Sequence, residues 1–238
     1  MRVLPKEDCL IPVVDCEPTP EIPPGASFWM PTEDDIPDDE GIGEFRDVWM
    51  ILNEPIDVAR EVIATETEYI GLIDRLADSV EDCEALAKIL ESGYPDELEP
   101  GPHLALLQRQ APHALERSEE DRSPLQGLEV GAAGLSYALS TIGAVPVASC
   151  RGHARGWSAR PVVFVALDEQ RARWIQPLVE AAGCGFDDGR DRGKFLIVEG
   201  PSIRHMNELA QRVVSEFDGR RELFARWLDP SVIQARYE

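Results

Sequence analysis

The amino-acid sequence predicts a fold of class α+β or α/β, in which an acidic, mainly helical N-terminal half with a proline-rich extended arm precedes a small α-β-β-α-β-α sandwich. Three observations lead to this prediction. The first 40 residues contain eight prolines, residues 45–90 carry apolar side chains at helical spacing, and the chain beyond residue 127 alternates β-branched runs with helical periods. We therefore divide the chain into an extended arm (1–44), an acidic helical region with a linker (45–125) and a compact α/β domain (126–238).

The proline-rich arm is expected to be extended rather than helical. Proline fixes φ and lacks a backbone N–H, so a segment with this proline content forms neither a regular helix nor a central strand. The arm also carries two apolar clusters, at residues 10–14 and 28–30, which a disordered acidic tail would not need. We therefore expect the arm to lie against its own domain or against a partner.

Residues 45–90 predict one or two amphipathic helices, because their apolar residues recur three, four or seven positions apart. Ser79, followed three residues later by Asp82, is similar to a capping box at a helix N-terminus. The helix is therefore expected to break near Asp78 and to restart towards residue 90. A shorter helix is expected after Pro102.

The C-terminal half is expected to alternate helices and strands, with β-branched residues marking the strands. The segments 161–167 and 195–198 are apolar on both faces, as strands covered on both sides are, so we expect a two-layer or three-layer sandwich. Pro177 predicts a kink or a two-piece helix, and the acidic segment 184–193 predicts an exposed turn. The expected elements are helix 128–142, strand 145–150, strand 161–167, helix 168–183, strand 194–199 and helix 202–217.

The net charge is confined to the N-terminal half. The chain holds 45 acidic and 23 basic residues, a formal net charge of -22. Residues 1–125 contribute 31 acidic against 9 basic residues, whereas residues 126–238 contribute 14 of each. Such an excess disfavours binding of nucleic acid or of an anionic membrane by the chain as a whole. It is typical of a half with a separate interaction role, and equally of a well-solvated surface.

Cysteine usage and the N-terminal residues favour a cytoplasmic, soluble protein. Five cysteines are an odd number without the spacing of a disulfide framework, which argues against a secreted domain. The first eight residues have too short an apolar run and too many acids for a signal peptide, and no apolar run approaches the length of about 18 residues that predicts a membrane span. The cysteines are Cys9, Cys16, Cys83, Cys150 and Cys184.

The candidate catalytic residues are Cys150 and His153, at the end of a predicted strand and the start of the next loop. A cysteine and a histidine placed there form either a nucleophile with its base or two ligands of a zinc ion. A structural zinc site needs four ligands, and the other weak metal candidates in this half, Cys184 and His205, have no paired spacing with them. No cofactor is therefore predicted, and zinc is the one left open. The alternative is a cysteine that only packs in the core.

The same loop is basic. Arg151, Arg155 and Arg160 lie around Trp157, and these four residues are the candidate ligand-binding set. Arginine forks next to an aromatic ring suit a phosphate, a nucleotide or an RNA loop. The alternative is that the arginines dock onto acidic residues of the N-terminal half or of a partner.

The run Ser149-Cys150-Arg151-Gly152, at the end of the predicted strand, resembles a motif of the wybutosine-synthesis methylases, which act on transfer RNA. The resemblance covers only these few residues. His153 stands where that motif has its usual basic residue after the glycine, and the acidic half contains no counterpart, so no function is carried over.

Two functional hypotheses follow from the charge pattern and the loop. The first is a non-enzymatic interaction protein, a regulatory or accessory subunit whose acidic N-terminal half engages a basic surface of a protein partner. The second is an enzyme, or a nucleotide-binding or RNA-binding protein, with its site at the loop 150–153. The first is favoured, because no segment carries a complete catalytic set.

Overall fold

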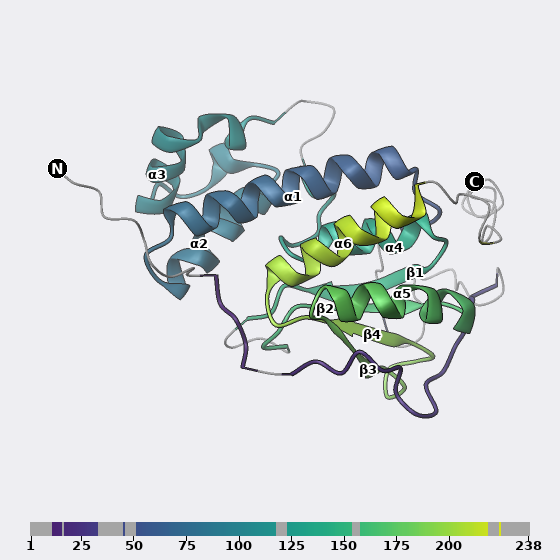
Figure 1. The fold of residues 1–238 in the computed structure, drawn as a ribbon. Helices are drawn as coiled ribbons and strands as arrows, with labels where there is room; N and C mark the ends of the chain where they lie inside the picture. The colour runs from purple at the N-terminus through teal and green to yellow at the C-terminus, as the bar shows by residue number, and fades with distance from the viewer. Residues whose placement is uncertain are drawn as a thin grey trace.

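The computed structural model describes residues 11–15, 17–32, 45, 51–117, 123–153, 158–218 and 224. Its helices are α1 (Ile56–Leu76), α2 (Val80–Glu91), α3 (Pro102–Gln110), α4 (Ala133–Thr141), α5 (Glu169–Ala181) and α6 (Ile203–Phe217), with the short 3-10 helices η2 (Pro95–Glu97) and η3 (Pro112–Leu115). Its strands are β1 (Val145–Cys150), β2 (Val162–Ala166), β3 (Gly185–Asp188) and β4 (Leu196–Glu199). The predicted mixed α and β fold is confirmed (Figure 1).

The four strands form one antiparallel sheet in the order β1-β2-β4-β3. Helices α4, α5 and α6 lie on one side of this sheet, and the N-terminal arm runs along the other (Figure 1). Helix α1 crosses over this helical layer and packs against α4 and α6. A single buried apolar cluster therefore extends from α1 and α2 through α4 and α6 to the sheet.

Three details of the C-terminal half differ from the sequence-based expectation. The segment predicted as an exposed turn at 184–193 contains β3, whose Phe186 is buried and pairs with Val198 of β4. The strand is only four residues long and two of its residues are aspartates, so its sequence has no periodic pattern that predicts a strand. Helix α5 continues as one element through Pro177, and α4 starts at Ala133 because the preceding residues form turns.

The arm covers the second face of the sheet with aromatic side chains. The Trp29 ring of the arm lies 6.1 Å from the Phe195 ring, and Phe45, the residue directly after the arm, packs edge-on against Phe164 of β2 with ring centroids 5.3 Å apart. The Trp29 backbone N–H donates to the carbonyl of Leu167 at 3.0 Å. In its described residues the arm therefore lies against its own domain, and the sheet is buried on both faces as its apolar strands predict.

Among the described helices, none combines the length and apolar character that crossing a membrane would require.

A fully buried carboxylate joins the N-terminal helices to the C-terminal half. Glu66 occupies a position on the buried stripe of α1, and its Oε1 accepts the backbone N–H groups of Gly131 (2.8 Å) and Gly134 (3.1 Å) at the start of α4. Its Oε2 accepts the Asn207 side-chain amide of α6 at 2.8 Å. Burial raises the pKa of the Glu66 carboxyl, and these hydrogen bonds oppose that rise. One side chain thus ties three helices together and satisfies donors that a helix start leaves unpaired.

The predicted break between the first two helices is confirmed, and its capping chemistry is visible. The Ser79 hydroxyl accepts the backbone N–H of Asp82 at 3.1 Å, while the Asp82 carboxylate accepts the backbone N–H of Asp78 at 3.0 Å. His103 of α3 lies 2.6 Å from the same carboxylate. The hydrogen bond from His103, followed by the backbone contact, lowers the pKa of Asp82 to about 2.

Two glycine-to-alanine substitutions are predicted to have opposite effects on the free energy of unfolding. Gly71→Ala in α1 should raise it by about 0.5 to 1 kcal/mol, because an added methyl group meets no atom and alanine is the better helix former. Gly134→Ala in α4 should lower it by about 2 kcal/mol or more, because its methyl group would overlap Glu66 Oε2. Urea unfolding measures both. Stabilisation by both substitutions would contradict the close packing of Glu66 on α4.

Asp82→Asn is predicted to remove part of the acid sensitivity of the fold. A carboxylate whose folded pKa is about 2, below its ordinary 3.8, contributes stability that is complete above 3.8 and is lost as the pH falls through 2. The variant should therefore be less stable than the parent near neutral pH, and the gap should close as the pH falls through that window. Unfolding midpoints measured across this pH series test it, and a gap that does not change with pH would argue against the lowered pKa.

Candidate functional site

The candidate site begins where β1 ends. Cys150 is the last residue of the strand, and the loop that follows folds back so that the His153 backbone N–H donates to the Ser158 carbonyl at 2.8 Å. Gly152 has a φ of +84°, and a Cβ at this position would lie 2.7 Å from the backbone carbonyl carbon of Arg160. Only glycine fits there without displacing the other limb of the loop. The glycine at position 152 therefore determines the turn of the loop, and with it the directions in which the Arg151 and His153 side chains point.

The Arg151 side chain is inserted between carboxylates of the N-terminal half. Its Nη2 lies 2.8 Å from Glu84, and its Nη1 lies 2.5 Å from Glu91, both on α2. Only 9% of the side chain is exposed. Burial lowers the pKa of Arg151, but the two carboxylates outweigh burial and raise it. The alternative stated for the basic loop, that its arginines dock onto acids of the same chain, is therefore what the structure shows for Arg151.

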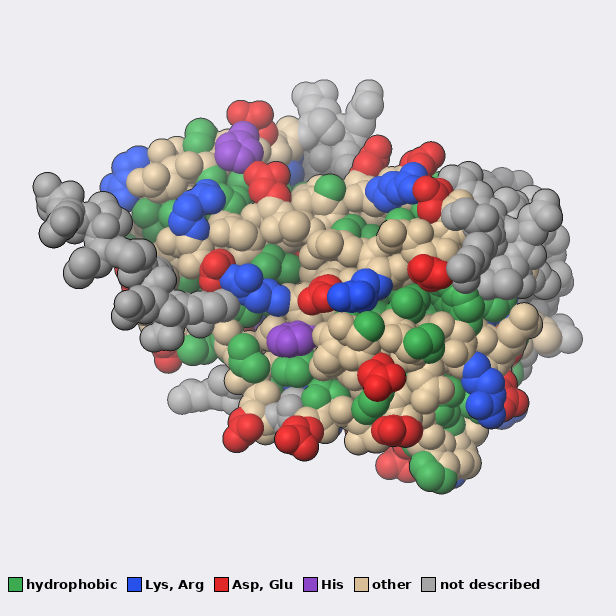
Figure 2. All heavy atoms as spheres, viewed as in Figure 1, with side chains coloured by type: hydrophobic (Ala, Val, Ile, Leu, Met, Phe, Trp, Pro, Cys, Tyr) green, Lys and Arg blue, Asp and Glu red, His purple; other side chains and the backbone are tan. Residues whose placement is uncertain are grey.

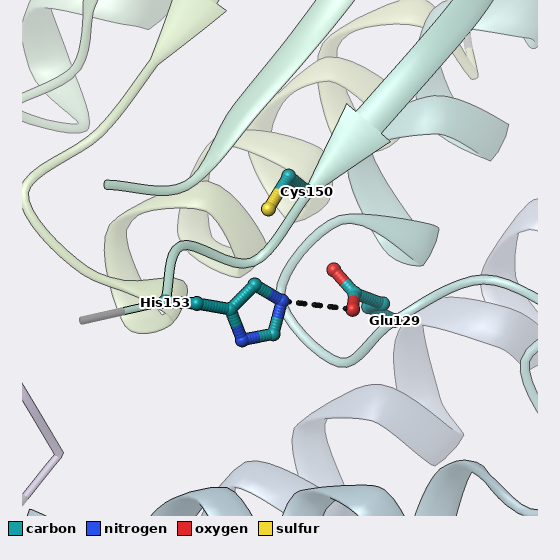
Figure 3. A group of neighbouring side chains, drawn as sticks. All are labelled: Glu129, Cys150 and His153. Atoms are coloured by element: carbon teal, nitrogen blue, oxygen red, sulfur yellow. Dashed lines mark hydrogen bonds and ion pairs between the residues drawn. The ribbon is translucent and has the colours of Figure 1, made fainter. Parts of the chain in front are cut away.

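His153 lies between two carboxylates. Its Nδ1 is 3.3 Å from Glu84 Oε2, and its Nε2 is 3.0 Å from Oε1 of Glu129. The other oxygen of Glu129 accepts the backbone N–H of Arg151 at 2.9 Å. Glu129 comes from the loop that precedes α4, so the site assembles α2, this loop and the end of β1. Figure 3 shows the side chains of Cys150, His153 and Glu129 directed towards one another.

The Cys150 thiol is buried at the inner edge of this group. The residue is 2% exposed, and its Sγ accepts the Gly152 backbone N–H at 3.4 Å. Burial raises the pKa of the Cys150 thiol, and the nearby Glu129 carboxylate adds to that rise. A thiol in this environment is not activated as a nucleophile. The geometry therefore does not support a cysteine–histidine catalytic pair, although one ligand atom from each of Cys150, His153 and Glu129 lies within 4.8 Å of the others.

The other predicted site residues lie apart from this group or outside the described residues. Arg160 Nε is 2.8 Å from the buried Glu199, and Arg155 and Trp157 fall outside the part of the chain that the structure describes. The weak metal candidates Cys184 and His205 do not join Cys150 and His153. Burial raises the pKa of the Cys184 thiol to about 12, and the His205 ring bonds the Ser202 hydroxyl at 2.8 Å.

Glu129 is the residue that sequence reasoning missed. It has no periodic or motif-like relation to Cys150, because the contact is made by folding the loop before α4 back onto the end of β1. One signal was present: Glu129 is the only acidic residue between residues 122 and 168. A single carboxylate in a stretch that also holds Arg151, Arg155 and Arg160 is the natural partner of those cations within the C-terminal half, which marks it for attention.

The space beside the loop is small. A cavity of about 50 Å³ lies between the arm, α2 and the loop, and Glu84 and Arg151 are among its lining residues. Sites that enclose a nucleotide-sized ligand measure roughly 300 Å³ or more. This cavity therefore does not admit a nucleotide.

Removal of the Arg151 guanidinium is predicted to destabilise the fold strongly. Arg151→Met leaves the largely buried Glu91 carboxylate without its cation and should lower the free energy of unfolding by about 3 to 5 kcal/mol. Arg173→Met is the matched control, because its pair with Glu169 is exposed and should cost less than about 0.5 kcal/mol. Urea titrations of the parent and both variants measure the difference. Equal small losses in the two variants would mean that the ion pairs of Arg151 do not hold the halves together.

Comparison of the chain with protein-family models, with curated proteins and with solved structures found no match. The function is therefore argued from the residues of the site and surface themselves.

Proposed function

We propose that this protein is a non-enzymatic interaction protein, a regulatory or accessory subunit whose acidic N-terminal half binds a basic surface of a protein partner. The supporting observation is the number of carboxylates that remain at the surface after the internal ion pairs are made. The exposed acidic residues of the described N-terminal half are Asp15, Glu17, Glu21, Asp57, Glu61, Glu68, Asp78, Glu81, Asp96, Glu97, Glu99 and Glu116. The exposed lysines and arginines of the same residues are Arg60, Arg75, Lys88 and Arg109.

Few of the N-terminal acids face the C-terminal half. Glu84 and Glu91 bind Arg151, and Asp74 binds Arg204 of α6 at 2.6 Å. The acidic side chains visible in Figure 2 are spread over the helical part and the lower edge of that face, with cations between some of them. A surface of this kind attracts a basic partner over a long range and speeds its association, in a way that salt weakens.

The alternative is an enzyme, or a nucleotide-binding or RNA-binding protein, with its site at the loop 150–153. It has less support, because Arg151 and Arg160 are engaged by carboxylates of the same chain and a phosphate would have to displace them. The small cavity and the unactivated Cys150 thiol add to this argument.

The proposal is tested by capture from a native lysate on the immobilised full chain, at low and high salt, followed by identification of the bound protein. A triple variant, Asp96→Asn, Glu97→Gln and Glu99→Gln, removes three neighbouring exposed charges. It should capture the same partner more weakly, because long-range attraction depends on the summed charge. Capture by the parent should also fall as salt is added.

The matched control removes three exposed charges from the C-terminal half: Glu180→Gln, Glu208→Gln and Glu216→Gln. This variant has the same net charge as the first one and should capture the partner nearly as well as the parent. Size-exclusion chromatography of low-salt lysate that shows only the free monomer would refute the proposal. Equal capture by the two triple variants would refute the assignment to the N-terminal half.

A further inference from the structure

We infer that Glu129, Cys150 and His153 form a binding site for one zinc ion. One ligand atom from each residue lies within 4.8 Å of the other two, and the three side chains are directed towards a common point (Figure 3). The inference is independent of the proposed interaction function, because it concerns the junction of the two halves and not the acidic surface.

The set of ligand atoms matches the preferences of zinc. Zinc binds thiolate sulfur at about 2.3 Å and imidazole nitrogen or carboxylate oxygen at about 2.0 to 2.2 Å. His153 Nε2 and Glu129 Oε1 already lie 3.0 Å apart, so it is the Cys150 sulfur that needs to approach them, by roughly 1 Å, which side-chain rotation supplies. The soft sulfur ligand disfavours magnesium and calcium, which prefer sets made of oxygen alone.

The neighbouring residues hold the ligands in the orientation that a metal requires. If His153 Nδ1 carries a proton, it donates to Glu84, which leaves the lone pair of Nε2 directed towards Glu129 and Cys150. A carboxylate on the distal ring nitrogen is the usual partner of a metal-bound histidine. The backbone N–H of Arg151 holds one oxygen of Glu129 at 2.9 Å and leaves the other for the ion.

The charges around the place where these three side chains meet also favour a divalent cation. The Arg151 guanidinium lies 3.8 Å from Glu129, but Glu84 and Glu91 bind it more closely. Three carboxylates therefore surround one guanidinium, and the Cys150 thiolate adds a further negative charge when it binds the ion, so the group carries an excess of negative charge that attracts an ion of charge two. When the ion binds, the Cys150 thiol proton passes to solvent and the Nε2 of His153 is unprotonated.

The position of the group leaves one coordination site for water. Cys150 is buried, whereas the side chains of His153 and Glu129 are 29% and 35% exposed. The ion would lie between the buried sulfur and the solvent-facing ligands, with three protein ligands and water in the fourth position. Catalytic zinc sites have this coordination, and closed structural sites have four protein ligands.

The test uses the full chain, purified without metal and titrated with zinc by calorimetry in the presence of excess magnesium. We expect each chain to bind one zinc ion in a saturable way. The excess magnesium occupies the weak oxygen-only sites on the acidic surface, so these sites do not add to the measured zinc binding. Cobalt titration of the same protein should give the near-ultraviolet charge-transfer band of a thiolate ligand. This band depends on sulfur coordination, so an acidic cluster alone does not produce it.

Two variants with matched controls assign the ligands. Cys150→Ser should abolish the cobalt–thiolate band and weaken zinc binding at least tenfold, while Cys184→Ser, another buried cysteine of the same half, should change neither. His153→Gln should weaken zinc binding to a similar degree, whereas His205→Gln should not. Circular dichroism shows whether each variant is folded, and the cobalt spectrum of the parent tests the site even where a variant is not.

Glu84→Gln tests the positioning of the histidine. It should weaken zinc binding about 10-fold to 100-fold, as the loss of an outer-shell partner does, while the cobalt–thiolate band remains. Glu81→Gln, on the exposed side of the same helix, is the control and should leave binding unchanged.

Three results would overturn the inference. They are no saturable zinc uptake by the parent, a cobalt complex without a thiolate band, and Cys150→Ser or His153→Gln variants that bind zinc as tightly as the parent.

Discussion

The ion pairs of the buried Arg151 guanidinium with Glu84 and Glu91 position the end of β1 and the loop after it against α2, and the candidate site depends on that placement. Burying a charge is costly, and the cost is recovered only where the partners are close and well oriented. Here the Arg151 guanidinium fixes the end of β1 against α2, and the backbone N–H of the same residue donates to Glu129 and orients it. The Arg151 Nε is buried without a hydrogen-bond partner among the described residues. The placement of the guanidinium between the two carboxylates therefore costs one unsatisfied hydrogen-bond donor.

Glu66 and the α2 carboxylates show that the acidic half has two kinds of acid. Glu66 and Glu91 each accept a backbone N–H from the segment that leads into α4, at Gly131 and Val130. These carboxylates act as hydrogen-bond acceptors for backbone N–H groups at the entry to α4, where a helix start leaves donors without intrahelical partners. Their role is local and independent of net charge. The acids on the described surface of the same half, such as Glu61, Glu81 and Glu97, face solvent, and the proposed interaction with a partner concerns these residues and not Glu66.

The elements that repeat a pattern were predictable from the sequence, and the contacts between distant segments were not. Strand β1 and helix α6 agree with the expected ranges to within one residue, and the Ser79 cap marks the start of α2 correctly. Strand β3 was missed because its two buried residues precede two aspartates, which together resemble a turn. The same limit applies to the site. Cys150 and His153 were identified from their residue types, but Glu84 and Glu129 reach His153 across 69 and 24 positions.

The two proposals differ in their dependence on salt, which separates the surface from the junction. Attraction between exposed charges is screened over about 8 Å at physiological ionic strength, so binding that depends on the exposed acids weakens steadily as salt is added. Coordination of an ion by a buried sulfur, an imidazole and a held carboxylate acts at bond distance and is far less screened. The acidic surface attracts every cation alike, whereas the proposed zinc site at Cys150 distinguishes among cations by ligand type. If the chain has two separate sites, added salt should therefore weaken partner binding while zinc remains bound.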